Sequence, residues 1–540
     1  MLAAVKKQNR KFYKKRKKMT TEEILQIGKV ERNDENIAII ERFKEQISSW
    51  LKSDKFQQIA EGGGSSTYAA LPYPPLLDPA SINYETSDIK LCWCLNLPLP
   101  PFYDFMIFGS HAVSLHSGVP AFLKLCNCGT AGRQGEKESF RIYEQFFTQL
   151  KAQKAAKDKG KIKKIALIVS DLALDSQNDK LYSLMPARHA INIVRDPISN
   201  IKGLCNLALQ RCTNDEADFS ELDTSDESIA RTKRRAIKQL CFSLNDEPSK
   251  TLSELIWYVS GHDGEQVTHE LAPTPAAVEY WMREIYQAFH DGVFARMLVR
   301  LDEIHTLQTK DFLGQNALNT MRALAAKFGF DEPKSEQEWL FKERVSDYKY
   351  FLPAPIMLNP SALNAKNGKA VMADEKDIMV LWLTSVFKSD EARKDITKHF
   401  DLPEFFRVET DPATAYNLLT SHMASKVKLY IKDLAAAIIE QSKKERAKHI
   451  SEADILEYFR GHEDSAEMFD GLLFQHLRRL RESEPKVLES FGFYKEFCQI
   501  LAEQRQKRGD DGSRYRLVRK GDDKSYAFAK FSKEQLEAMK

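Results

Sequence analysis

Residues 191–200 read INIVRDPISN, and this stretch does most to decide the fold. Its first four residues are mostly apolar β-formers, which predicts the end of a buried strand. Asp196 is a helix-capping residue type, and Pro197 has a φ angle already suited to a first helical turn. A strand that leads directly into a helix is therefore expected here.

Arg195 lies between this strand and this helix. In open α/β sheets, ligands bind at the carboxyl ends of the strands, and a helix N-terminus there favours an anion. A guanidinium can hold a phosphate with two parallel hydrogen bonds. The first interpretation is therefore a phosphate site, and the alternative is an Arg195–Asp196 ion pair that caps a surface helix.

The surrounding chain alternates between strand-like and helix-like segments. Further strands are expected at residues 103–108, 165–169 and 304–307, and helices at 119–126, 139–150 and after 311. This alternation predicts a parallel sheet with helical crossovers. After residue 351 strands become scarce, and helices are expected at 377–387, 413–442, 451–459 and 466–491.

Four regions follow from these patterns. They are a basic tail (1–19), a helical segment with a Gly/Pro-rich linker (20–84), an α/β domain (85–350) and a mostly α-helical C-terminal domain (351–540). The chain of 540 residues is long enough for two or three domains.

The charge is distributed unevenly along the chain. Residues 1–18 hold nine Lys or Arg and no acid, and without them the formal net charge would fall from +3 to −6. Residues 6–18 could bind an anionic membrane surface or form a solvated extension. Translation could also start at Met19 instead of Met1. No apolar run of spanning length and no secretory signal occur, so a cytoplasmic protein is expected, with peripheral contact at the inner membrane.

Two C-x-C pairs, Cys92 with Cys94 and Cys126 with Cys128, could supply four zinc ligands. Structural zinc sites more often use C-x₂-C, and a C-x-C in a strand simply puts both thiols on one face. Buried free thiols in a reducing compartment are therefore expected, and no metal site is predicted.

A second anchor for phosphate is the loop at residues 109–118, GSHAVSLHSG, between a strand and a helix. Such a loop of small residues can offer backbone N–H groups to an anion. Together with R-D-P 78 residues after Ser117, and Thr309–Phe312 (TKDF) before a helix, these motifs resemble the sulfotransferases that use 3′-phosphoadenylyl sulfate. The resemblance implies a P-loop-like, sulfotransferase-like core, with the loop on the 5′-phosphosulfate and Arg195 on the 3′-phosphate.

By this resemblance, the residues that bind the nucleotide are Gly109, Ser110, Ser117, Gly118, Arg195, Asp196 and Ser199. His116 stands where the family has Lys or Arg, and Val119 and Pro120 stand where hydroxyl residues would contact phosphate. Gly203 stands where the family has a serine that contacts the phosphate. Ser199, in the first helical turn, would take the place of that serine.

Transfer to a hydroxyl needs a general base. Asp171, at the end of the second strand, lies where the family has its base, and the alternative is that it caps a helix. His111 and His116 are rival bases because imidazole titrates near neutral pH. Their alternative is a loop histidine bonded to backbone.

The chain also resembles an uncharacterised bacterial family with an IVRDPIS core and an IFGSH loop, whose members are sometimes labelled sugar transferases. This resemblance extends through FLPAP at residues 351–355.

The expected function is transfer of a sulfuryl group from phosphoadenylyl sulfate to a hydroxyl of a carbohydrate or surface glycan. One alternative is a glycosyltransferase that uses a nucleotide sugar, although no D-x-D motif is present. Another is a non-catalytic nucleotide-binding or interaction protein of the same fold. No G-x-x-x-x-G-K-[ST] occurs, which excludes a complete P-loop GTPase or ATPase motif, and no specific nucleic-acid partner is predicted.

Overall fold

The computed structural model describes residues 19–56, 73–115, 118–132, 138–170, 176–210, 242–244, 246–253, 255–263, 266–284, 301–343, 348, 350–358, 379–388, 392–412, 423–519 and 526–538. The chain divides into two compact units. Unit 1 comprises Met1–Ile201, Trp281–Arg344 and Leu456–Lys540, and unit 2 comprises Lys202–Tyr280 and Val345–Ile455.

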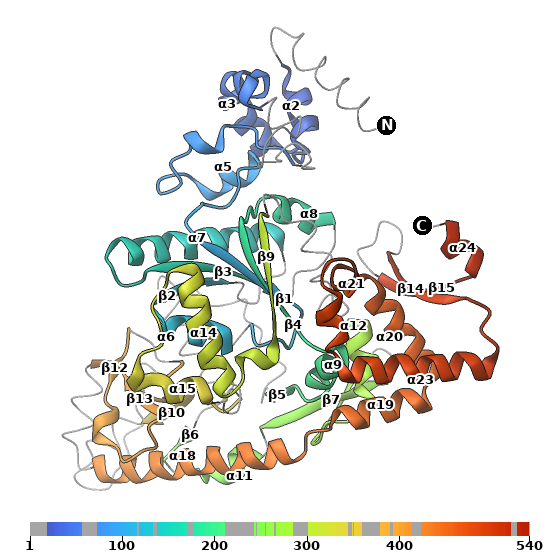
Figure 1. Cartoon of the computed structure of the whole chain (residues 1–540). Coiled ribbons are helices and arrows are strands. Elements are labelled where there is room, and N and C mark those ends of the chain that lie inside the picture. Colours follow the sequence, from blue (N-terminus) through green and yellow to red (C-terminus); the bar gives the residue numbers. More distant parts are fainter. Residues whose placement is uncertain are drawn as a thin grey trace. The chain divides into compact units, whose positions relative to one another are not determined.

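A parallel five-stranded sheet forms the centre of unit 1, with the order β2-β3-β1-β4-β9 (Figure 1). The strands are β1 (Phe105–Gly109), β2 (Cys128–Gly132), β3 (Lys164–Ser170), β4 (His189–Val194) and β9 (Glu303–Gln308). Ile107 of the central strand is in register with Ile168 of β3 and with Ile191 of β4. The mixed α/β class and the parallel sheet predicted from the sequence are confirmed.

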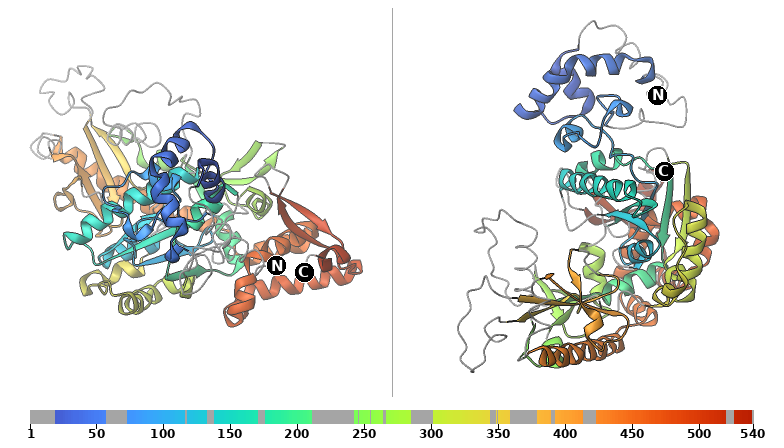
Figure 2. Two further views of the ribbon diagram at one scale, coloured as in Figure 1. Left: turned by 90° about the horizontal axis from the view of Figure 1, so that it is seen from above. Right: turned by 90° about the vertical axis from the view of Figure 1, so that its left-hand side faces the viewer.

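Side chains on both faces of the central strands are buried, as expected for a parallel sheet covered by helices. Met106 and Phe108 share a hydrophobic cluster with Tyr143 and Phe146 of α7 (Ser139–Asp158). Phe105 points to the other face and stacks on Phe328 of α14 (Gln315–Phe328), with 4.4 Å between ring centroids. Figure 2 shows these helices on opposite sides of the sheet.

The connections leave the sheet in two directions. The chain passes from β1 through α6 (Gly118–Leu125) to the edge strand β2, and it then crosses back through α7 and α8 (Ser176–Ser183) to β3 and β4. The strand order therefore reverses at β1. In open α/β sheets a crevice for ligands forms at such a reversal, outside the carboxyl ends of the strands.

The remaining elements of unit 1 lie before and after this sheet. The N-terminal ones are α2 (Thr21–Gly28), α3 (Asp34–Lys52), η2 (Pro79–Ser81) and α5 (Ile89–Cys94). Those after β9 are η4 (Thr309–Phe312), η5 (Ser335–Gln337), α15 (Glu338–Lys342), α20 (Glu463–His476), α21 (Arg478–Ser483), α22 (Pro485–Glu489), α23 (Gly492–Arg508), β14 (Arg514–Arg519), β15 (Tyr526–Phe531) and α24 (Lys533–Ala538). The helix pair predicted in residues 20–55 is confirmed by α2 and α3.

The described residues of unit 2 form two small sheets. One has the order β12-β13-β11-β10-β6 and the other β5-β7-β8. The elements are β5 (Ala208–Gln210), β6 (Phe242–Ser243), α11 (Pro248–Ser253), β7 (Ile256–Asp263), β8 (Gln266–Glu270), β10 (Ala354–Leu358), β11 (Met379–Ser385), β12 (Lys394–Asp395), η7 (Thr397–His399), β13 (Phe406–Thr410) and α18 (Ala424–Ala447). Three helices, α9 (Pro197–Cys205), α12 (Ala277–Glu284) and α19 (Glu452–Gly461), each begin in one unit and end in the other.

The helix predicted at residues 377–387 is wrong, because residues 379–385 form strand β11 in the middle of a sheet. A short apolar run fits a buried strand as well as a helix. β10, β12 and β13, and the β14–β15 hairpin, also lie after residue 351, so the expectation that strands are scarce there is wrong too.

The paired cysteines are free and buried thiols. Cys92 and Cys94 lie on helix α5 rather than on a strand, which corrects the strand interpretation of that pair. Burial raises the pKa of Cys92 and of Cys126 to about 12, so both thiols stay protonated at neutral pH. The described residues contain no helix with the length and apolarity needed to cross a bilayer.

Asp104 holds the amino end of β1 to its neighbour β3. Its carboxylate accepts hydrogen bonds from Lys157 Nζ (2.8 Å), Lys164 Nζ (3.1 Å) and the Ile165 N–H (2.9 Å). Burial acts to raise the pKa of Asp104, but these donors outweigh it, and the pKa lies below its ordinary value of 3.8.

We expect Asp104→Asn to lower the stability of unit 1 by about 1–2 kcal/mol at pH 7. A depressed carboxyl pKa contributes stability above its unfolded value, and this stability is lost as pH falls through the folded value. The wild type should therefore lose its advantage below about pH 4. Urea unfolding of both proteins between pH 7 and pH 3 measures this, and a pH-independent difference would contradict it.

Candidate functional site at the carboxyl edge of the sheet

The loop after β1 adopts an unusual backbone conformation. Ala112 and Ser114 have positive φ angles of 60° and 70°, which non-glycine residues rarely adopt. Within the described residues, no acceptor pairs with the N–H groups of Val113 or Leu115. Backbone N–H groups in turns that alternate right- and left-handed conformations form concave anion sites. The loop therefore has the donors that an anionic group requires.

Arg195 connects the end of β4 to this loop. Its Nη1 donates a hydrogen bond to the carbonyl oxygen of Ala112 at 2.9 Å, and the residue is partly buried. The surface-capping interpretation requires Arg195 to pair with Asp196 alone. The bond to Ala112 shows that Arg195 also has another partner. The guanidinium stands beside the loop at the reversal of strand order.

Asp196 makes the helix cap expected from the sequence and a second set of contacts to α23. Its Oδ1 accepts the N–H of Ile198 at 3.0 Å, which is the predicted helix cap. Its Oδ2 accepts the N–H groups of Phe493 (3.0 Å) and Tyr494 (3.2 Å), in the first turn of α23. Burial raises the pKa of Asp196, and these N–H groups act against that shift without cancelling it. The carboxylate therefore caps two helices at once.

Ser110 and Gly109 are packed at the start of the loop. The Ser110 hydroxyl accepts a hydrogen bond from Asn200 Nδ2 at 3.0 Å, and both residues are buried. A Cβ added to Gly109 would lie 2.5 Å from the carbonyl oxygen of Ile193, so only glycine fits there. Gly118 begins helix α6, and His111 and Ser199 are partly buried.

Two asparagines that no sequence motif marked also belong to this edge. Asn192 on β4 and Asn200 on α9 are buried, and each has a side-chain carbonyl oxygen without a donor among the described residues. Buried polar oxygens without a partner are costly and call for a ligand, water or ion. The signal was available, because both asparagines interrupt apolar positions in residues 191–200.

Three predicted site residues, His116, Ser117 and Asp171, lie outside the described residues. The proposed base and the end of the loop stay predictions. Residues 118 and 170, next to two of them, begin α6 and end β3. Because β3 runs parallel to β1 and β4, Ser170 lies at the same edge of the sheet as Arg195.

The third predicted element, Thr309–Phe312, is the short helix η4 before α14. Asp311 accepts the N–H of Gln308 at 2.7 Å, and Thr309 Oγ1 donates to the carbonyl oxygen of Val194 at 3.4 Å. These bonds fix the ends of β9 and β4 next to each other.

Helix α21 and the residue that precedes α22 form hydrogen bonds with the same strand β9. Arg479 Nη2 donates to Thr306 Oγ1 at 2.9 Å, and Thr306 Oγ1 donates to Glu484 Oε1 at 2.8 Å. Arg479 and Glu484 also form an ion pair, and Arg479 is buried. No sequence motif marked this triad, because its members are far apart along the chain.

The comparisons with known proteins identify one family model. It is described as a protein of unknown function (DUF2972), and it matches residues 306–503. No curated protein matches the chain, and no solved structure matches it. The matched segment begins on β9 and ends within α23, so it includes the groups bonded to Asp196 and excludes β1 and Arg195.

Proposed function

We propose that the chain is a sulfotransferase-like transferase with 3′-phosphoadenylyl sulfate as donor and a hydroxyl of a carbohydrate or surface glycan as acceptor. The observation that supports it most is the joining of the loop after β1 to Arg195 at the reversal of strand order. A P-loop-like core belongs to this proposal, and a parallel sheet with β1 at its centre is consistent with it.

The residues fit such a donor in part. The N–H groups of Val113 and Leu115 suit the phosphosulfate, and Arg195 suits the 3′-phosphate. Guanidinium has five N–H donors, so a bond to Ala112 is compatible with a phosphate contact. His116 in place of a fixed cation would need a proton to stabilise the leaving group.

In the proposed reaction, the acceptor oxygen forms a bond to sulfur while the sulfur–oxygen bond to the 5′-phosphate breaks. Adenosine 3′,5′-bisphosphate leaves, and Asp171 takes the proton of the acceptor hydroxyl. His111 and His116 are the rival bases. The protein contributes positioning, N–H donors at the edge of the sheet and the base.

The test is calorimetric titration of the full chain with adenosine 3′,5′-bisphosphate. We expect micromolar binding, weakened at least about tenfold in Arg195→Ala, because a bidentate charged hydrogen-bond pair is lost. The matched control is Arg188→Ala, since Arg188 is exposed at the opposite, amino end of the same strand.

Arg195→Ala also removes the bond to the Ala112 carbonyl, so Arg195→Lys is included to separate charge from fork geometry. Lysine can bind phosphate through a single point contact. If the wild type shows no binding, or binds no better than Arg195→Ala, the sulfuryl-donor proposal fails. Titration with nucleotide sugars then tests the glycosyltransferase alternative.

The non-catalytic alternative has its own observation in favour. Asp196, part of the R-D-P motif, is engaged in capping α9 and α23. A folded wild type that binds neither donor class would support an interaction protein in which R-D-P serves to dock the C-terminal helices.

A further inference from the structure

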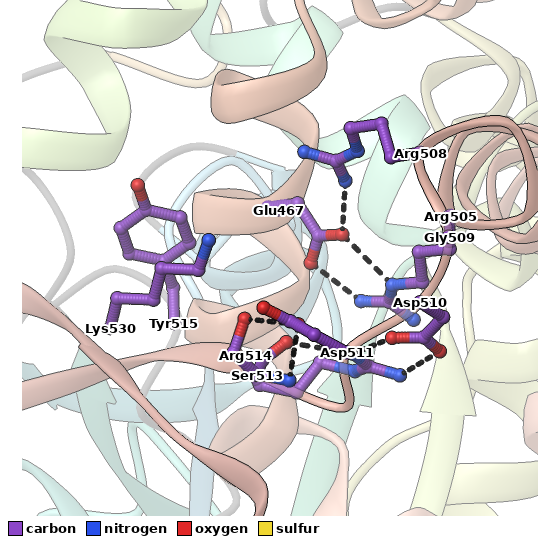
Figure 3. A pocket seen from close by; sticks show the side chains of 10 residues that line it. All are labelled: Glu467, Arg505, Arg508, Gly509, Asp510, Asp511, Ser513, Arg514, Tyr515 and Lys530. Carbon is purple, nitrogen blue, oxygen red and sulfur yellow. Dashed lines mark hydrogen bonds and ion pairs between the residues drawn. The ribbon is translucent and has the colours of Figure 1, made fainter.

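A polar pocket lies at the other end of α23, within unit 1 (Figure 3). It is lined by Glu467 on α20, Arg505 and Arg508 on α23, the loop 509–513, and Arg514, Tyr515 and Lys530 on the β14–β15 hairpin. Helix α23 has 17 residues and rises about 1.5 Å per residue, so the pocket lies roughly 20 Å from the end that Asp196 caps. The two sites are separate.

Each carboxylate of this pocket accepts hydrogen bonds from neighbouring residues, and Oδ1 of Asp511 accepts the N–H (2.8 Å) and the hydroxyl (2.6 Å) of Ser513. Buried Glu467 accepts Arg505 Nε at 2.9 Å and Nη2 at 2.7 Å, and Arg508 Nη2 at 2.8 Å. Both oxygens of Asp510 accept Arg514 at 2.8 Å. These ion pairs lower the pKa of Glu467 although its burial acts to raise it.

The hydrogen-bonding capacity that remains belongs mainly to donors. Among the described residues, Lys530 Nζ and the Tyr515 hydroxyl have no hydrogen-bond or ion-pair partner, and Nη1 of Arg505 and of Arg508 has none either. Tyr515 and Lys530 are directly paired across the hairpin. Figure 3 shows them on one side of Glu467 and the two arginines on the other.

We propose that this pocket binds a phosphate or sulfate group, held between Lys530 and Tyr515 on the hairpin and the arginines of α23. Arg505, Arg508 and Arg514 are oriented by their ion pairs before a ligand arrives. Arg505 and Arg508 also pair with Asp470 and Glu463, which do not line the pocket, so the case for an oxyanion rests on the N–H and O–H donors that remain unpaired. A tetrahedral oxyanion accepts from several converging donors at once, which a neutral ligand cannot match. The pocket, about 180 Å³, has room for such a group.

The test uses trace acylation of lysines in the full chain, read by peptide mass spectrometry. The probes are sodium phosphate, sodium sulfate and glycerol phosphate, each compared with sodium chloride at equal ionic strength. We expect at least one oxyanion to slow acylation of Lys530 several-fold. Lys507 is the matched control, since it is exposed on the same helix and does not line the pocket, and its rate should not change.

Protection by inorganic phosphate or sulfate alone indicates a free ion, and stronger protection by glycerol phosphate indicates an ester. Tyr515→Phe should raise the half-protecting concentration about tenfold, as expected for a lost bond to a charged acceptor. Arg195→Ala should leave the protection intact, so failure at the sheet edge and failure here are distinguishable. Equal rates for Lys530 in oxyanion and chloride would overturn the proposal.

Discussion

Gly109→Ala is expected to destabilise unit 1 by about 3 kcal/mol, because an added methyl group has no room there. The new Cβ would lie 2.5 Å from the carbonyl oxygen of Ile193 and 2.9 Å from Cγ2 of Val113. The first contact is to backbone in a buried strand, so β4 would have to move. Arg195, two residues further on, would move with it.

The matched control is Gly132→Ala, at the carboxyl end of β2 in the same sheet. Its added Cβ would meet Ile168 at 3.7 Å, an ordinary contact, and the change should be neutral or slightly stabilising. Urea unfolding followed by circular dichroism compares the two variants with the wild type. Equal midpoints for the two variants would show that the end of β1 can relax, against the prediction.

The predictable part of the fold is the part that consists of buried strands. β1, β3, β4 and β9 were expected because each is a short run of apolar residues next to turn or helix signals. β2 reads CGTAG, and its small residues carry no strand pattern. It forms because its backbone pairs with β3 in parallel, which is a tertiary effect.

The site was predictable only where residue type carries the signal. Arg195 was expected at the edge of the sheet for its charge and its place between strand and helix. Its partner is the carbonyl oxygen of Ala112, and the partners of Asp196 are the N–H groups of Phe493 and Tyr494. Backbone atoms are the same in every residue, so a sequence does not show which of them a side chain will meet.

Asp196→Ala is expected to lower the stability of unit 1 by about 3 kcal/mol, because four N–H groups lose their acceptor, those of Ile198, Ser199, Phe493 and Tyr494. The N–H groups of Phe493 and Tyr494 lie in the first turn of α23, where backbone N–H groups have no acceptor within the helix. Amide hydrogen exchange should therefore become faster at these two positions. Asp302→Ala is the control, since this carboxylate is exposed next to the amino end of β9.

Asp196→Asn is expected to be intermediate at neutral pH, because its amide keeps one acceptor oxygen and turns an NH₂ donor toward the N–H groups of the other helix. Burial raises the pKa of Asp196, so the folded state favours the neutral side chain more than the unfolded state does. With the sign worked out, this contribution is complete below the unfolded value of about 3.9 and is lost as pH rises through the folded value. The stability of the Asn variant relative to wild type should therefore improve as pH rises through that window.

The same two variants separate capping from nucleotide binding. If Asp196 acts by capping, Asp196→Asn, with one acceptor oxygen left, loses exchange protection at the start of only one helix, α9 or α23, and keeps the affinity for adenosine 3′,5′-bisphosphate, whereas Asp196→Ala loses the protection of both. If the carboxylate charge itself positions Arg195 for the phosphate, Asp196→Asn also loses that affinity. An Asp196→Ala variant with wild-type exchange at Phe493 and Tyr494 would contradict the capping role, because an intact first turn would then not depend on this acceptor.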